Sequence, residues 1–423
     1  MKEDFLYYVW QFKKFELSKL RTVEGDDLQI LNSGQFSGLS GPDFFNARLV
    51  IGDQVWAGNV EMHLNSSDWY VHNHEQDSAY DNVILHVVWQ YNTPVFRGDN
   101  TPIPTLEIKK YVSADLVSNY QSLIQNKSWI NCEKFIGSVD SFLIENWIER
   151  LFLERLEQKT SLIYEEIERS KGDWEAVLFV LLAKNFGLHT NGFAFFEIAK
   201  SIPFDVVRKE ANDLLNLEAI FLGQAQILEK EVEDVYFKDH KSRYAFLAHK
   251  YQLLKTDFIS VQFFKVRPDN FPTIRLSQLA QLYHINNNLF TDVVKLASAE
   301  ECYNLFQVKS SEYWQTHYTF GKESTLKVKK VSKSFVDLLI INTIIPIQFA
   351  YFHYSGQGNV EQLISFIKQI VPEENTVVGN FQKRGFQSKS AMDSQSLLQL
   401  KSEYCAKLKC LSCAIGVEVL RGA

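Results

Sequence analysis

The sequence predicts an α+β protein in which an N-terminal mixed β-sheet flanked by helices precedes a large, mainly α-helical region. Two patterns lead to this prediction. Between residues 28 and 111, short runs of alternating apolar and polar residues are separated by Gly, Pro, Asn and Asp, which is typical of strands. Beyond residue 114, apolar residues recur at spacings of three and four almost to the end of the chain, which indicates helices.

The N-terminal elements can be placed in order. Residues 1–19 carry apolar side chains at helical spacing and are expected to form a helix. A polar, histidine-rich segment, residues 65–82, connects the third expected strand to the fourth and should be part loop and part helix. The expected strands are Leu28–Leu31, Phe45–Ile51, Val55–Leu64, Val83–Gln90 and Thr105–Ile108.

The remaining chain predicts helical domains. We expect an αβ domain at residues 1–140, a helical domain at 141–240, and a helical C-terminal domain with a cysteine cluster at 241–423. The expected helices are Phe142–Glu168, Trp174–Phe186, Leu214–Leu228, Leu276–Tyr283, Phe335–Ile344, Val360–Ile370 and Gln395–Leu408.

The composition is that of a globular protein. Of the 423 residues, 46% are hydrophobic and 22% are charged. The formal net charge of −7 gives no general attraction to phosphate, so a nucleic-acid partner would need a local basic surface. Five cysteines are too few for a disulfide scaffold, and the longest apolar run, residues 338–352, is too short to span a bilayer. We expect a cytoplasmic protein that does not bind membranes.

The strand at residues 55–64 carries the first candidate site. Glu61 and His63 share one face of this strand, because side chains alternate. A hairpin turn at Gly52-Asp53 pairs the strand with the preceding one and brings Asp43 close to Glu61. Two carboxylates suit Mg²⁺ or Mn²⁺, which would activate a water molecule. We therefore predict that Asp43 and Glu61 bind the metal and that His63 takes part in catalysis.

The register of this hairpin adds a structural prediction. With a two-residue turn and regular pairing, Asp43 would lie opposite Met62, on the other face from Glu61. A bulge would bring both carboxylates to one face, and bulges are common beside active sites. We expect a bulge or splay near residues 42–46 or 59–62.

Pro42-Asp43, followed by Glu61-x-His63 on the next strand, resembles the motif of the PD-(D/E)xK nuclease superfamily. The resemblance implies a restriction-endonuclease-like fold, in which a mixed sheet flanked by helices forms in the order helix, three strands, helix, strand. It also implies metal-dependent cleavage of nucleic acid. His63 stands where the superfamily usually has lysine. Many members use a further carboxylate from the first helix, for which Glu3 and Glu16 are available.

Histidines and acidic residues cluster after this strand. The residue types of His72, His74 and Asp77 suit zinc, although their spacing matches no specific zinc signature. Together with Asp68, they either surround Glu61 as a substrate- or metal-positioning wall, or cap and hold the connection between strands. His86 alternates within an apolar strand and is interpreted as a core histidine.

Cysteines and basic residues form two further candidate sites late in the chain. Cys405-x4-Cys410-x2-Cys413, with the distant Cys132, could hold zinc or an iron–sulfur cluster, as in some PD-(D/E)xK relatives, or could be buried small hydrophobic residues. Basic stretches either bind nucleic acid or form an ordinary solvated surface. The basic candidates are Lys327, Lys329, Lys330, Lys383 and Arg384.

Motifs along nearly the whole chain resemble the DUF2851 family of bacterial proteins, and this resemblance implies a bacterial cytoplasmic protein without implying an activity. The motifs are Ser40–Phe44, Trp56–His63, Ser66–Trp69, Asn82–Trp89, Phe221–Ala225, Arg267–Pro272 and Tyr404–Gly416.

The leading functional hypothesis is a metal-dependent, nuclease-like phosphodiesterase that acts on nucleic acid. One alternative is a catalytically inactive scaffold of the same fold that binds nucleic acid or protein. The other is a zinc-dependent hydrolase that uses His63, His72, His74 and Asp77. The motifs specify no oligomeric state.

Overall fold

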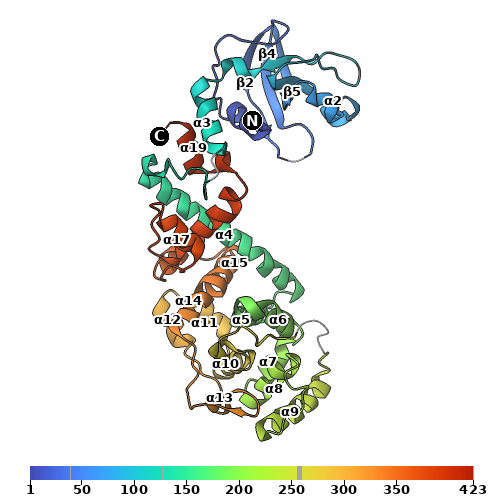
Figure 1. The fold of residues 1–423 in the computed structure, drawn as a ribbon. Helices are drawn as coiled ribbons and strands as arrows, with labels where there is room; N and C mark the ends of the chain where they lie inside the picture. Colours follow the sequence, from blue (N-terminus) through green and yellow to red (C-terminus); the bar gives the residue numbers. More distant parts are fainter. Residues whose placement is uncertain (39, 126–127, 255–259, 423) are drawn as a thin grey trace. The chain divides into compact units, whose positions relative to one another are not determined.

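The computed structural model describes residues 1–38, 40–125, 128–254 and 260–422 and confirms the mixed α+β class. The chain forms two compact units (Figure 1). The first comprises Met1–Trp147 and Leu400–Ala423, and the second comprises Ile148–Gln399. The sequence predicted three consecutive domains, whereas in the structure the C-terminal segment belongs to the same compact unit as the N-terminal residues.

The first unit is built around a mixed sheet whose strand order is β1-β2-β4-β5-β6-β7, with β3 paired to β4. Strands β2, β4 and β5 are successively antiparallel, whereas β6 runs parallel to β5 and β7 parallel to β6. The five expected strands are confirmed. The bounds are β1 Leu20–Arg21, β2 Asp27–Asn32, β3 Gln35–Phe36, β4 Phe44–Ile51, β5 Gln54–Asn65, β6 Val83–Gln90 and β7 Thr105–Glu107.

Helix α1 (Glu3–Gln11) packs against β5, and its residues Phe5 and Val9 are fully buried. It is shorter than the expected helix over residues 1–19, because Lys13 takes a left-handed conformation with φ of +50° and ends the helical path. The apolar spacing continues beyond that point because Phe15 is also buried, where its ring stacks on that of Trp10. The first helix therefore covers the strand that carries the candidate site.

The connection between β5 and β6 is part helix and part loop, as predicted. It contains α2 (Asp68–Val71) and two short 3₁₀ helices, η1 (His74–Gln76) and η2 (Ser78–Tyr80). Buried Trp69 and Tyr80 pack with apolar residues of β6 and the loop that follows it, so the connection is anchored to the sheet.

A bulge lies where the sequence predicted one. The pairs Phe44–Val60 and Ala47–Gly58 enclose three residue steps on β4 but two on β5. The backbone of Asn46 has a φ of +57°, in the left-handed region. Because of this extra residue, the β4 side chains before the bulge lie on the opposite face from the one that regular pairing with β5 would give them. Asp43 directly precedes this part of β4.

The rest of the first unit joins residues distant in sequence. Helix α3 and the C-terminal helix α19 pack side by side (Figure 1), and the Asn119 side chain donates to the Leu420 carbonyl at 3.3 Å. The elements are η3 Ile108–Tyr111, α3 Ala114–Gln125, η4 Ile136–Ser138, the π-helix η7 Leu400–Cys405, η8 Cys410–Ser412 and α19 Ala414–Leu420.

The second unit is mainly helical, which confirms the second half of the predicted fold class. The division from the first unit falls within α4, and the expected helix Gln395–Leu408 is divided between α18 and η7. The bounds are α4 Ser141–Arg169, α5 Trp174–Phe186, α6 Leu188–Lys200, α7 Phe204–Glu210, α8 Leu214–Gln224, α9 Val235–Tyr251, η5 Pro268–Asn270, α10 Pro272–Ile285, α11 Leu289–Lys295, α12 Ala299–Leu305, α13 Tyr313–Thr316, β8 His317–Thr319, β9 Lys322–Glu323, α14 Lys333–Leu339, the π-helix η6 Ile340–Ile344, α15 Ile345–Ser355, α16 Val360–Ile367, α17 Thr376–Gln382 and α18 Ala391–Gln399.

One continuous helical segment of the second unit, Lys333–Ser355, is long and apolar enough to cross a membrane by length and composition. However, 72% of its most apolar window is buried inside the protein, as in the core helix of a soluble protein. The sequence-based expectation considered only the apolar run at residues 338–352, which is too short to span a membrane, and did not include the helical residues on either side of it.

Candidate metal centre

The two predicted carboxylates meet at the bulge between β4 and β5. The backbone N–H of Asp43 donates to Glu61 Oε2 at 3.1 Å, and the N–H of Met62 donates to Asp43 Oδ2 at 3.0 Å. Burial raises the pKa of both carboxyl groups, and the charge of Glu61 raises the pKa of Asp43 further. Such a pair keeps both negative charges at neutral pH only when a cation offsets them; without a cation, one of the two carboxyl groups binds a proton.

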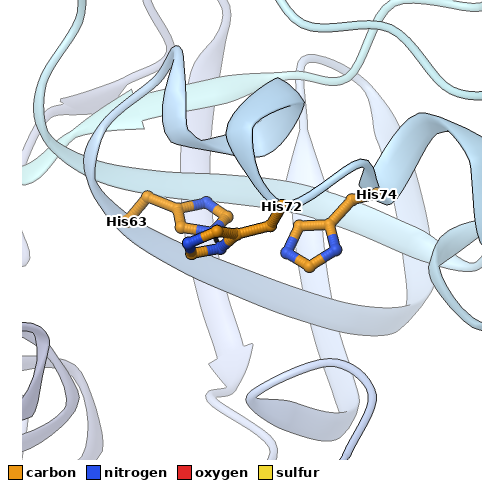
Figure 2. A group of neighbouring side chains, drawn as sticks. All are labelled: His63, His72 and His74. Atoms are coloured by element: carbon orange, nitrogen blue, oxygen red, sulfur yellow. Dashed lines mark hydrogen bonds between the residues drawn. The ribbon is translucent and has the colours of Figure 1, made fainter.

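Beside this carboxylate pair, three imidazoles gather at one place, and Figure 2 shows these three side chains. His63 follows Glu61 on the same face of β5, whereas His72 and His74 come from the connection to β6. Asn73, with a φ of +57°, separates His72 from His74. One ligand nitrogen of each of the three histidines lies within 4.8 Å of the other two. The hypothesis that these histidines form a positioning wall near Glu61 is consistent with this geometry.

Glu61 lies close to two of these three histidines. Its Oε1 lies 3.4 Å from His74 Nε2 and 3.7 Å from His63 Nε2, and His63 Nε2 lies 3.0 Å from His72 Nδ1. Ligands about 2.05 Å from a tetrahedral zinc ion are roughly 3.3 Å apart. His74 Nε2 is buried and lacks a hydrogen-bond partner within the described ranges. The spacing and the unused lone pair fit a bound transition-metal ion.

His86 contacts His63 on the side of the ring away from Glu61, through the Nδ1 atom of His63. His63 Nδ1 lies 2.8 Å from His86 Nε2, deep in the sheet. Burial, reinforced by the neighbouring histidines, lowers the pKa of His63 to about 2 and of His86 to about 3, so both rings are neutral at physiological pH. If His63 donates through Nδ1, its Nε2 lone pair faces the donor group, which is how supporting partners orient metal-binding histidines. His86 is buried as expected, but it also touches the site.

Helix α1 contributes two groups that close the site on another side. The Tyr7 hydroxyl hydrogen-bonds to Asp43, and burial raises the pKa of Tyr7 well above its usual value. Glu3 lies within electrostatic range of His72 and His74, and burial raises its pKa. Glu16 instead accepts a hydrogen bond from Ser18 at 2.6 Å. Of the two first-helix carboxylates that the sequence offered, Glu3 is therefore the one at the site.

Asp68 and Asp77 have structural contacts outside the donor group. Asp68 accepts a hydrogen bond from the N–H of Asn65 at 2.9 Å, and Asp77 caps η2 by accepting from the N–H of Ala79 at 2.9 Å. The zinc alternative placed Asp77 beside the histidines, whereas Glu61 supplies the carboxylate at that point.

The basic candidates lie in the second unit and are not equivalent. Lys327 pairs with Asp269 at 2.6 Å, and the buried Lys329 donates to the backbone carbonyls of Trp314 and Gln315. Burial of Lys329 contradicts its expected role as a phosphate contact, because its ammonium is occupied inside the protein. Lys330 and Lys383 are exposed, and Arg384 is half-buried and donates to a backbone carbonyl at 2.9 Å.

The four cysteines predicted as a group lie in the first unit. Cys132 follows α3, whereas Cys405, Cys410 and Cys413 belong to the C-terminal segment. Sequence reasoning missed Tyr7, and no local pattern marks it, because its approach to Asp43 depends on how α1 packs on the sheet.

Comparison with known proteins gives a family without an activity. Residues 3–376 match the family described as "Protein of unknown function (DUF2851)". The C-terminal cysteine segment lies beyond the matched residues. No curated protein and no solved structure matches the chain. Because the match covers most of the sequence, the chain belongs to the DUF2851 family.

Proposed function

We propose that the chain is a metal-dependent hydrolase that cleaves phosphodiester bonds in nucleic acid, with its ion held by Glu61 and the imidazoles of His63, His72 and His74. The observation that carries this proposal is the convergence of Glu61 Oε1 with His74 Nε2 and His63 Nε2 at ligand-to-ligand distances. His74 Nε2 is buried and makes no hydrogen bond among the described residues, so this nitrogen is available to a bound ion.

The donor chemistry favours zinc or manganese over magnesium. Imidazole nitrogens suit transition metals, and a mixed set of imidazoles and a carboxylate is typical of hydrolytic centres. Magnesium prefers oxygen ligands, so the initial expectation of Mg²⁺ on Asp43 and Glu61 alone is the less favoured form of the proposal. Asp43 lies beside the donors and is oriented by the Tyr7 hydroxyl and the Met62 N–H.

The topology supports nucleic acid as the substrate. Helix α1, the antiparallel strands β2, β4 and β5, the partly helical connection and the parallel strand β6 follow the order of the PD-(D/E)xK superfamily. In this proposal, we assign Asp43 and Glu61 to the two acidic positions of that motif. The resemblance is one of element order and motif, and His63 replaces the usual lysine, so the imidazoles would hold the ion in place of a fixed positive charge.

In the proposed reaction, an ion held by these residues would lower the pKa of a bound water molecule and would stabilise the negative charge that develops on the phosphate oxygens. The side chains of this chain have three roles. Glu61 and the imidazoles fix the position of the ion. His86 orients His63. Tyr7 stays protonated, because its pKa is raised, and so holds Asp43 by a donated hydrogen bond.

The test combines metal content with cleavage. Purified full-length protein, loaded with Zn²⁺ or Mn²⁺, is incubated with single- and double-stranded DNA and RNA. We expect Glu61→Gln to lower cleavage by at least about 100-fold, since supporting partners alone are worth 10- to 100-fold in metal affinity or activity. The matched control is Asp77→Asn, which alters an exposed helix cap near the site and should retain both metal and cleavage.

Two results would overturn the proposal. Equal cleavage by Glu61→Gln and the unmodified protein would place the activity elsewhere. Stoichiometric metal that depends on Glu61 and His74, without cleavage of any of the four substrates, would favour the scaffold alternative over an enzyme.

A further inference from the structure

Four of the five cysteines come together in the first unit although Cys132 and Cys413 are far apart in sequence. The Asn131 side chain hydrogen-bonds to Cys410, which joins the two segments directly. Lys401 strengthens the junction, because its Nζ donates to the Trp129 carbonyl at 2.6 Å and lies 4.3 Å from the Trp129 ring centroid. Packing between α19 and η4 brings the same two segments together.

The C-terminal thiols sit on a tightly turned backbone. The Cys413 N–H donates to the Cys410 carbonyl at 3.3 Å, where η8 leads into α19. A Cβ on Gly416 would lie 2.2 Å from the Cys410 carbonyl oxygen, so only glycine fits this turn. The turn holds Cys410 and Cys413 close together, and Cys410 hydrogen-bonds to Asn131, the neighbour of Cys132.

The thiols also influence one another electrostatically. Burial, together with the nearby Cys413 and Cys410, raises the pKa of Cys132 to about 12. Burial raises the pKa of Cys405 as well, and the nearby Cys413, Cys132 and Cys410 contribute to this increase. All four thus belong to one group, and three of them are half-buried rather than sealed in an apolar core. Small apolar packing, the simpler interpretation, would not explain why four thiols share one half-buried place.

The four thiols are reduced and unpaired by disulfides. Because they are buried close together, these groups stay protonated unless a metal offsets the negative charges of their thiolates. Lys401 lies near enough to Cys405 to favour its charged form, and Lys409 directly precedes Cys410. Positive side chains of this kind suit a centre whose total charge is negative.

The spacing distinguishes between two kinds of thiolate centre. Zinc bound to sulfur at 2.3 Å in a tetrahedron places the sulfurs roughly 3.8 Å apart. Among the described residues, the histidine group is the one compact set of three or more metal-ligand atoms, and the cysteines are not part of it. The four cysteines are therefore not arranged as a ready-made site for a single zinc ion. Four cysteine ligands, shared among the iron atoms, are the set that holds a polynuclear iron–sulfur cluster.

We propose that Cys132, Cys405, Cys410 and Cys413 bind an iron–sulfur cluster that joins the C-terminal segment to the N-terminal unit. Each thiol releases its proton to solvent as its sulfur binds iron. The cluster is independent of the proposed hydrolytic ion, since the two sites share no ligands.

The first test uses the unmodified chain, purified without oxygen from iron-replete cells. We expect two or four iron atoms per chain, an equal amount of acid-labile sulfide, and the broad visible absorption of iron–sulfur clusters. One zinc ion per chain without sulfide would overturn the cluster assignment. Neither iron nor zinc would overturn the metal site altogether.

Variants then locate the site. Cys132→Ala and Cys410→Ala should each reduce bound iron at least tenfold, whereas Cys302→Ala, which removes the fifth cysteine in the second unit, should leave iron and sulfide unchanged. Glu61→Gln should also leave them unchanged, which separates this site from the hydrolytic ion. Full iron content in folded Cys132→Ala would contradict the assignment, with far-ultraviolet circular dichroism reporting the fold.

Discussion

At the residue scale, Lys159 is an ammonium group buried within the second unit. It lies on α4, and its hydrogen-bond partners in the described part of the chain are neutral oxygens of Gln395 at 2.8 Å, Asn342 at 3.1 Å and Ile341 at 3.2 Å. Burial, with a contribution from Arg155, lowers the pKa of Lys159 to about 7, and Glu373 partly opposes this. Its charged form is therefore costly in the folded protein.

This shift predicts a pH-dependent stability. Unfolded lysine keeps its proton up to about pH 10.4, whereas folded Lys159 loses it near pH 7. Between these values the unfolded chain binds more protons, so the free energy of unfolding rises with pH. Relative to Lys159→Met, the unmodified protein should gain up to about 1.4 kcal/mol per pH unit from pH 7 to 10. Urea unfolding of both proteins at several pH values measures this, and a constant difference would contradict it.

At the element scale, the pairing of β5 with β6 depends on a glycine. A Cβ on Gly58 would lie 2.5 Å from both the Asn82 carbonyl oxygen and a methyl group of Ile84. Because Asn82 contributes backbone here, the contact cannot be relieved by rotating a side chain. The start of β6 and the strand that carries Glu61 would have to separate.

Gly58→Ala should therefore destabilise the protein by about 1–3 kcal/mol, the usual cost of forcing extra atoms into a packed site. Thermal unfolding followed by circular dichroism measures the effect. Gly137→Ala is the matched control, because a Cβ there meets nothing within 4 Å, and it should cause little change. Equal unfolding temperatures for the two variants would refute the role of Gly58.

The elements show which structural information the sequence carries locally. Alternation of side chains predicted the five principal strands, and the conflict between that alternation and a shared Asp43–Glu61 face predicted the bulge. The end of α1 was not predictable in the same way, because the buried side chain of Phe15 continues the apolar spacing after the helical backbone has stopped. Beyond Gln11, buried side chains therefore no longer indicate a helical backbone.

The candidate site was partly predictable for a related reason. Glu61 and His63 lie two residues apart on one strand, so their common face follows from strand geometry alone. The approach of His74 to Glu61 requires the left-handed turn at Asn73, and the approach of Tyr7 to Asp43 requires the packing of α1 on the sheet. Neither contact leaves a periodic signal.

At the scale of the whole molecule, the first unit is discontinuous in sequence. Helix α19 buries Ile415, Val419 and Leu420 and packs against α3, whose Tyr120 and Leu123 are also buried. The C-terminal segment is therefore a structural part of the unit that contains the candidate metal centre.

Deleting residues 400–423 should destabilise the first unit by at least about 4.5 kcal/mol, because Ile415, Val419 and Leu420 alone lose about 1.5–3 kcal/mol each when they leave their buried sites. The expected result is a lower unfolding temperature and aggregation on size-exclusion chromatography. A control that lacks only residues 421–423 keeps α19 and should behave like the unmodified protein. A monodisperse, equally stable deletion of 400–423 would contradict the prediction.

This connectivity has a consequence during protein synthesis. The ribosome makes residues 148–399 between the two parts of the first unit, so those residues can fold while the first unit still lacks α19. The surface of α3 that packs on α19 stays uncovered until residues 414–420 have been synthesised. Translation that stops early would leave nascent chains in which residues 1–147 expose apolar surface, which chaperones and proteases can recognise.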